Sequence, residues 1–169
     1  MPDDCTCLID PGKIIVAAKL KYKENQRFLR KMKSLNPQEL DNVAHQLHEE
    51  VFRYTDCLAC ANCCKSISPA MRERDVERIA SSLHLKPSEV VVKYMHLDTD
   101  GDYVFNAAPC PFLNQDNRCK VYDDRPKACR EYPHTNRRKF SQLLELTLKN
   151  TAVCPAVFSI VEKMKNTLG

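Results

Sequence analysis

Tryptophan is absent from the chain, and glycine occurs only three times in 169 residues. A glycine-rich phosphate loop needs closely spaced glycines so that its backbone can approach the phosphate. A fold built mainly of hairpins needs many tight turns, which glycine favours. No apolar run approaches the roughly 18 residues that a membrane-spanning helix requires. These absences argue against a phosphate-loop protein, a β-rich fold and a transmembrane segment.

The beginning of the chain lacks the pattern of a secretory signal. It reads Met1-Pro2-Asp3-Asp4, which is acidic, and its only early apolar run is the five residues from Ile14 to Ala18. A signal peptide begins with basic residues and continues with a longer apolar stretch. We therefore expect a cytoplasmic protein, in which cysteine thiols stay reduced and serve as metal ligands or redox groups.

The abundant residue is cysteine, with ten copies, and four of them lie in the eight residues from Cys57 to Cys64. A Cys-x-x-Cys step lets both thiolates reach one metal ion about 2.3 Å away. The segment contains two such steps that share Cys60, and Cys64 follows Cys63 directly. Adjacent side chains are expected to diverge, so Cys63 and Cys64 should serve different ions or different atoms of a cluster. Further ligands should then come from elsewhere.

Four more cysteines are available downstream, which raises the candidate ligand set to eight: Cys57, Cys60, Cys63, Cys64, Cys110, Cys119, Cys129 and Cys154. Eight thiolates suit two tetrahedral zinc ions, or one iron–sulfur cluster with four cysteines left over. Disulfides or buried thiols are the alternative, but the close spacings favour metal. Two zinc ions would leave a charge of about −4. Nearby cations are therefore candidates to donate hydrogen bonds to sulfur or to bond nearby carbonyls: Arg125, Lys127, Arg130, Arg137, Arg138 and Lys139.

Basic residues are concentrated before the cysteines. Eight lysines and arginines lie between Lys13 and Lys33 with one acid, Glu24. A solvated helix face explains such a segment, and binding to nucleic acid or to an acidic membrane surface is the alternative. We predict a basic and helical N-terminal segment over residues 1–35 and a cysteine-cluster metal-binding domain over residues 36–169.

The spacing of apolar residues predicts a mainly α fold with one small hairpin. Asn36 should cap a helix that begins at Pro37. Asp100-Gly101 indicates a hairpin turn before a strand over 103–105. Residues 107–138 look irregular. Helical spacing is found at 13–34, 36–53, 76–83, 87–96, 140–148 and 155–168.

The cysteine motifs resemble those of the YkgJ-like cysteine-cluster family of zinc- or iron-chelating domains. The resemblance covers about residues 50–155 and depends on three motifs: Cys57-x-x-Cys60-x-x-Cys63-Cys64, Cys110-Pro-Phe-Leu, and Cys119-Lys-Val-Tyr-Asp-Asp-Arg-Pro-Lys-Ala-Cys129-Arg-Glu-Tyr-Pro. It implies that all eight candidate cysteines, Cys154 included, bind zinc or an iron–sulfur cluster. A similar cysteine block in the flagellin lysine methylase family implies the iron–sulfur option and relates it to protein methylation.

Three functions follow from these observations. The first is a metal-binding protein with zinc or an iron–sulfur cluster as its cofactor. The second is an iron–sulfur enzyme or electron-transfer protein, and the third, supported only by the basic segment, is a zinc-dependent protein associated with nucleic acid. No catalytic residue or substrate is indicated, and a protein partner stays open. Cys5 and Cys7 lie outside the matched motifs and are expected to be reduced thiols.

Overall fold

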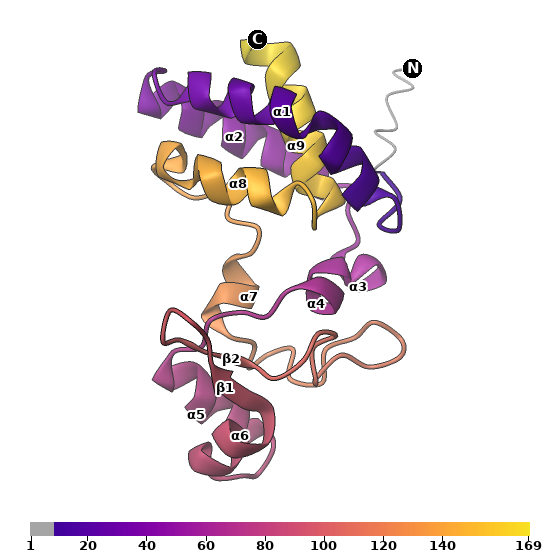
Figure 1. Cartoon of the computed structure of the whole chain (residues 1–169), viewed down its shortest axis with the longest axis vertical. Helices are drawn as coiled ribbons and strands as arrows, with labels where there is room; N and C mark the ends of the chain where they lie inside the picture. The colour runs from indigo at the N-terminus through magenta and orange to yellow at the C-terminus, as the bar shows by residue number, and fades with distance from the viewer. Residues whose placement is uncertain (1–8) are drawn as a thin grey trace. The chain divides into compact units, whose positions relative to one another are not determined.

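The computed structural model describes residues 9–169, which form two compact units (Figure 1). Among the described residues, unit 1 comprises residues 9–56 together with Pro133–Gly169, and unit 2 comprises Cys57–Tyr132. Cys5 and Cys7 fall outside the described residues. Within the described part of the chain, no helix is both long and apolar enough to cross a membrane.

Unit 1 is a set of helices around one main apolar core (Figure 1). Helix α2 packs against α9, and α1 packs against α8 and α9. The core is built from all of them, and its largest fully buried side chains include Met32, Leu40 and Phe140. The elements are α1 (Ile14–Met32), α2 (Pro37–Phe52), the 3-10 turn η1 (Phe140–Leu143), α8 (Leu144–Asn150) and α9 (Pro155–Leu168).

The helix starts of unit 1 follow the expected local chemistry. The Asn36 side chain accepts hydrogen bonds from the N–H groups of Gln38 and Glu39, and Pro37 occupies the first turn of α2. Asp41 of α2 is buried, and its carboxylate accepts bonds from the N–H groups of Lys139 and Phe140, both at 2.8 Å. The two bonds to Asp41 join α2 to η1. They also satisfy the carboxylate, which is why it can be buried.

Unit 2 contains shorter elements and a smaller core. Phe112 lies at its centre, where it packs against Phe105 and Tyr94 with ring centroids 5.3 and 5.0 Å apart. Cys110 and Cys119 pack against the edge of this core. The elements are α3 (Cys57–Cys60), α4 (Asn62–Ser66), α5 (Glu73–Ser82), α6 (Pro87–Tyr94), β1 (Met95–Leu97), β2 (Tyr103–Phe105) and α7 (Lys127–Glu131).

The strands β1 and β2 form the small antiparallel hairpin that the sequence predicts, with Met95 opposite Phe105. Asp98 closes the turn by accepting bonds from the N–H groups of Asp100 and Asp102, and Gly101 has a φ of 84°. The helix predicted over 87–96 ends earlier, at Tyr94, because the backbone of Met95 turns extended and pairs with β2. The mainly α fold with one hairpin is confirmed.

Candidate metal centre

The first four cysteines lie on two short helices joined by one residue. Cys57 and Cys60 belong to α3, and Cys63 and Cys64 belong to α4. Ala61 between them is buried in the left-handed conformation, with a φ of 47°, and its N–H donates to the carbonyl of Cys57. The chain therefore changes direction within the cysteine motif instead of continuing as one helix.

The sulfur atoms of Cys63 and Cys64 lie 4.0 Å apart and share a hydrogen bond. The expectation that the two adjacent side chains diverge is therefore wrong, because α4 holds them at a helical step. The pKa of Cys64 is lowered to about 7 despite partial burial, chiefly by this hydrogen bond and also by the charges of Arg125 and Lys65. Cys64 is thus a good source of thiolate near neutral pH.

The loop that carries Cys110 and Cys119 is attached to α3 and α4 by two hydrogen bonds. The N–H of Cys110 donates to the carbonyl of Cys64 at 2.8 Å, and the Asn117 side-chain amide donates to the carbonyl of Ala59 at 2.9 Å. A backbone bridge between Leu113 and Cys119 then folds the loop back on itself. Segments about 50 residues apart in the chain are joined in this way.

Three downstream cysteines have pKa values above the ordinary thiol value. Burial is the main cause, raising the pKa of Cys110 to about 11 and that of Cys129 to about 12, and also raising the pKa of Cys119. The second cause for Cys129 is the charge of Cys64, and that charge acts on Cys110 and Cys119 as well. Cys64, Cys110, Cys119 and Cys129 are therefore close enough to repel one another when ionised.

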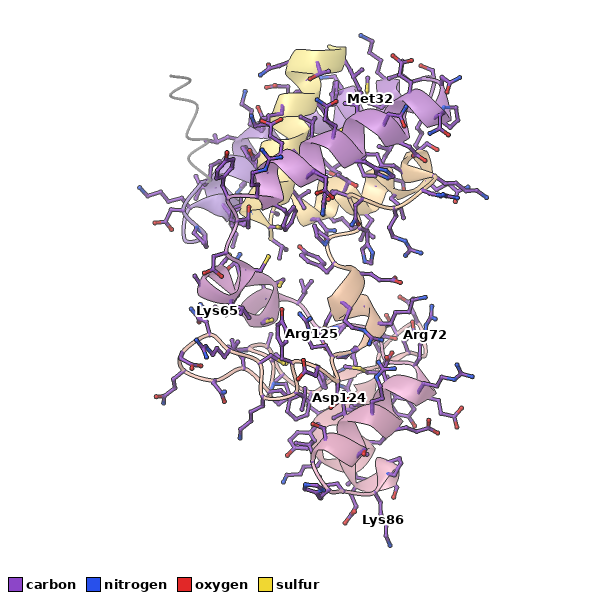
Figure 2. All side chains as sticks on the ribbon, turned by 180° about the vertical axis from the view of Figure 1, so that it is seen from behind. Met32, Lys65, Arg72, Lys86, Asp124 and Arg125 are labelled. Atoms are coloured by element: carbon purple, nitrogen blue, oxygen red, sulfur yellow. The ribbon has the colours of Figure 1, made fainter. Side chains whose placement is uncertain are left out.

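Arg125, which is labelled in Figure 2, is a cation whose charge acts on the thiols of Cys64, Cys119 and Cys129. Its guanidinium lies 3.5 Å from the centre of the Tyr122 ring, and its Nε donates to the Tyr122 carbonyl at 2.6 Å. Its charge lowers the pKa of Cys64 and opposes the rise at Cys119 and Cys129. The expected bond to a nearby carbonyl is confirmed. Hydrogen bonds from the other candidate cations to sulfur stay a prediction.

Asp75 of α5 anchors the segment that carries Arg125. Its carboxylate, only 1% exposed, accepts from the N–H groups of Arg72 and Lys127, both at 3.0 Å, and from Arg78 Nη2 at 2.5 Å. Arg78 Nη2 also donates to the Arg125 carbonyl at 3.2 Å. Burial alone would raise the pKa of Asp75, but these bonds outweigh it and lower the pKa. Sequence reasoning missed Asp75, although its position three residues before Arg78 on a helix was a usable signal.

Cys154 is the residue directly before α9 in unit 1, a position that the following Pro155 predicts because proline favours the first turn of a helix. Its N–H donates to the Asn150 carbonyl at 2.8 Å, and its side chain packs against the core of that unit. The other seven candidate cysteines belong to unit 2. The membership of Cys154 in the ligand set therefore stays a prediction from the sequence.

The described residues fit a soft metal by their chemistry, since thiol sulfur is a ligand of both zinc and iron. Among residues 9–169, however, no three cysteine, histidine, aspartate or glutamate side chains stand close enough together to hold an ion as placed. The sulfur atoms of Cys64, Cys110, Cys119 and Cys129 lie in one region of unit 2, and they must come closer to one another to bind a metal ion.

A comparison with family models matches residues 56–154, which is more than half of the chain, to the CxxCxxCC family, described as a putative zinc- or iron-chelating domain. The chain belongs to this family. The match begins one residue before Cys57 and ends at Cys154, so it includes all eight candidate cysteines. Membership of the CxxCxxCC family supports metal binding in general. A comparison with curated proteins finds no match, and a comparison with solved structures finds none either.

Proposed function

We propose that the protein binds zinc or an iron–sulfur cluster through cysteine thiolates, and that the bound metal organises unit 2. The observation that carries the proposal is the gathering of cysteines in unit 2. The sulfur atoms of Cys63 and Cys64 lie 4.0 Å apart, and the N–H of Cys110 donates to the Cys64 carbonyl at 2.8 Å. Burial raises the pKa values of the Cys110, Cys119 and Cys129 thiols. Without a cation, burial and mutual repulsion keep most of these groups protonated. A metal ion reverses this balance, because it displaces the protons and makes adjacent thiolates favourable.

The ligand set in this proposal has three parts. Cys63 and Cys64 supply a preformed pair, with sulfur atoms 4.0 Å apart, close to the roughly 3.8 Å that two thiolates of a tetrahedral zinc site require. Cys110, Cys119 and Cys129 supply the downstream thiolates. Cys57, Cys60 and Cys154 complete the set of eight. Arg125 reduces the excess negative charge, and Asp75 holds the Arg125 segment in position.

The function follows from the ligands rather than from any reactive group beside them, so we assign metal binding and no reaction. The proposal includes a reducing, cytoplasmic location, which keeps the thiols available. The named partner is the metal ion.

The test is to purify the full chain anaerobically, measure its metal and acid-labile sulfide, and record its visible spectrum. A colourless protein with about two zinc ions selects zinc. A brown protein with absorbance near roughly 400 nm, iron and sulfide selects the cluster. Absence of bound zinc and iron, or S–S bonds among the eight cysteines, would contradict the proposal.

Single serine variants test the ligand set. Cys64→Ser should lower metal occupancy as much as Cys60→Ser does, because both remove a thiolate from the same motif. Cys7→Ser is the matched control, since Cys7 lies outside the family match and should leave occupancy unchanged. Unchanged occupancy in Cys64→Ser would show that the eight-ligand count is wrong.

A further inference from the structure

Helix α1 packs against the rest of unit 1 through only one of its sides. Ile14, Ala18, Phe28, Leu29 and Met32 are buried in the apolar clusters of unit 1. At 3.6 residues per turn, positions 16, 19, 20, 23, 27 and 30 lie on the opposite side of the helix, and position 15 lies at the edge of that side. We call this side the outer face of α1; its residues are Val16, Lys19, Leu20, Lys23, Arg27 and Arg30, with Ile15 at its edge.

The outer face exposes aliphatic side chains that a solvated helix would not need. Leu20 is 80% exposed, Ile15 67% and Val16 63%. Val16 and Leu20 lie one turn apart on the outer face and Ile15 lies at its edge, whereas single exposed apolar residues elsewhere are ordinary. The first half of the outer face is therefore partly apolar.

Cations lie among these aliphatic residues. Lys19, Lys23, Arg27 and Arg30 are exposed on the outer face, and no acid lies among them. The acid of this helix, Glu24, lies to one side, where it is paired with Lys21 at 2.9 Å and with Lys165 of α9. The charge of the outer face is consequently positive and uncompensated, which complements an anionic surface.

We propose that the outer face of α1 docks the protein on an anionic lipid bilayer, with the helix axis parallel to the membrane. At the bilayer interface, short aliphatic side chains enter the acyl boundary while lysine and arginine stems extend to the lipid phosphates. The core of a protein interface is instead depleted of lysine. Nucleic acid phosphates would pair with the cations but would leave Ile15, Val16 and Leu20 in water. The mixed composition of the face therefore favours lipid over the other two partners.

Docking in this manner needs no rearrangement of unit 1, because the buried side of α1 keeps its contacts. The inference is independent of the metal proposal, since the outer face contains no cysteine. The two proposals can fail separately.

The test is sedimentation of the full-length protein with vesicles of phosphatidylcholine alone or with about 30% phosphatidylserine. We expect binding only to the anionic vesicles and release by salt. Each Lys or Arg near such a surface contributes about fivefold to partitioning. Combined Lys19→Gln, Lys23→Gln and Arg27→Gln should therefore weaken binding by about 100-fold.

Two matched controls make the result specific to the outer face. Arg74→Gln, Lys86→Gln and Lys93→Gln remove three exposed cations of unit 2 and should leave vesicle binding within about threefold of the wild type, since they lie outside α1. Combined Ile15→Ser, Val16→Ser and Leu20→Ser should weaken binding by about tenfold. Val92→Ser is the control, because this side chain is 83% exposed on α6 and lies outside α1. It should not weaken vesicle binding.

Five results would overturn the inference. Four of them are absence of binding to anionic vesicles, equal binding to uncharged vesicles, equal loss in the unit 2 control, and wild-type binding after the three aliphatic substitutions. Tighter binding to single-stranded RNA than to anionic vesicles would assign the face to nucleic acid instead. Unchanged thermal unfolding of the outer-face variants would show that lost binding is not lost folding.

Discussion

Unit 1 and unit 2 of the same chain are stabilised in different ways. Unit 1 has three helices of 14 residues or more, α1, α2 and α9, and one apolar core to which they all contribute. Unit 2 has helices of 10 residues or fewer, a two-stranded hairpin and seven cysteines. Short helices are marginal without tertiary support, so unit 2 depends more on its side-chain contacts.

The difference between the units indicates which of them a bound metal would stabilise. In unit 1, aliphatic and aromatic packing is sufficient to define the structure. In unit 2, the segment from Cys110 to Cys129 is joined to its surroundings by Phe112 in the small apolar core, by hydrogen bonds such as those of Cys110 and Asn117, and by the contacts of its thiols. We therefore expect metal to stabilise mainly unit 2 and to affect unit 1 only around Cys154, the proposed ligand that belongs to that unit.

Metal removal should give the largest effect. Structural metal sites contribute roughly 10 kcal/mol or more of apparent binding free energy. Chelation should therefore increase amide hydrogen exchange across Cys57–Tyr132 and leave α2 and α9 protected, as read by mass spectrometry of peptides. Equal protection of unit 2 with and without metal would remove the contrast between the units.

The dependence of metal affinity on pH should show whether the buried thiols of unit 2 are metal ligands. Cys110, Cys119 and Cys129 have raised pKa values, so each stays protonated at pH 7–8 and releases one proton when metal binds. Metal affinity should then rise about tenfold per pH unit for each thiol, or about 1000-fold for the three. Cys64, with a pKa of about 7, adds little above neutrality. Competition with a chelator at pH 7 and 8 measures this slope, and a slope near zero would contradict the assignment of these ligands.

Truncation of the unit 1 core should destabilise the protein without changing its metal content. Phe140 is fully buried, so Phe140→Ala should lower the free energy of unfolding by about 3–5 kcal/mol. Urea denaturation followed by circular dichroism measures the loss. Leu146→Ala is the matched control, because Leu146 of α8 is 39% exposed and should cost much less.

The anchor at Asp75 links folding to the metal site. Asp75→Asn removes the charge that Arg78 pairs with, so the segment with Arg125 and Cys129 should loosen and metal affinity should fall about 10- to 100-fold. The folded pKa of Asp75 is depressed, so its contribution is present above the unfolded value and is lost as pH falls through the folded pKa. Glu77→Gln, on an exposed position of the same helix, is the control in the affinity titration. An equal loss in both variants would refute a positioning role for Asp75.

The smallest expected effect lies at the start of α2. Asn36→Ala removes the side-chain oxygen that caps two N–H groups and should cost about 1 kcal/mol of stability. Asn36→Gly should cost only a few tenths. Urea unfolding of both variants compares them, and metal occupancy should be identical to that of the wild type.

Much of unit 1 was predictable because its information is local or periodic. Apolar residues three and four apart identified α1, α2 and α9, and Asn36-Pro37 identified the start of α2. The hairpin was predictable for a similar reason, since Asp100-Gly101 is a turn signal between short strands. The boundary of α6 at Tyr94 was not, because pairing with β2 decides it.

The candidate site was predictable in its residues but not in its arrangement. Cysteine spacing identified the candidate ligands, but it could not reveal the helices α3, α4 and α7, which are too short for a periodic signal. Asp75 was missed because the segment that it anchors lies about 50 residues away along the chain. Lys127 donates to Asp75 directly, and the carbonyl of Arg125 is held by Arg78.

The sequence by itself determined the helical character of the protein, the capped start of α2, the hairpin and the membership of its cysteines in a chelating motif. These depend on side-chain periodicity, turn chemistry and residue type, all of which are read within a few positions. Only the tertiary structure decided that Cys63 and Cys64 point together, that Cys64, Cys110, Cys119 and Cys129 repel one another, and that Asp75 anchors their neighbour Arg125. Those relations depend on distances between segments far apart in the chain, which burial and backbone hydrogen bonds establish during folding.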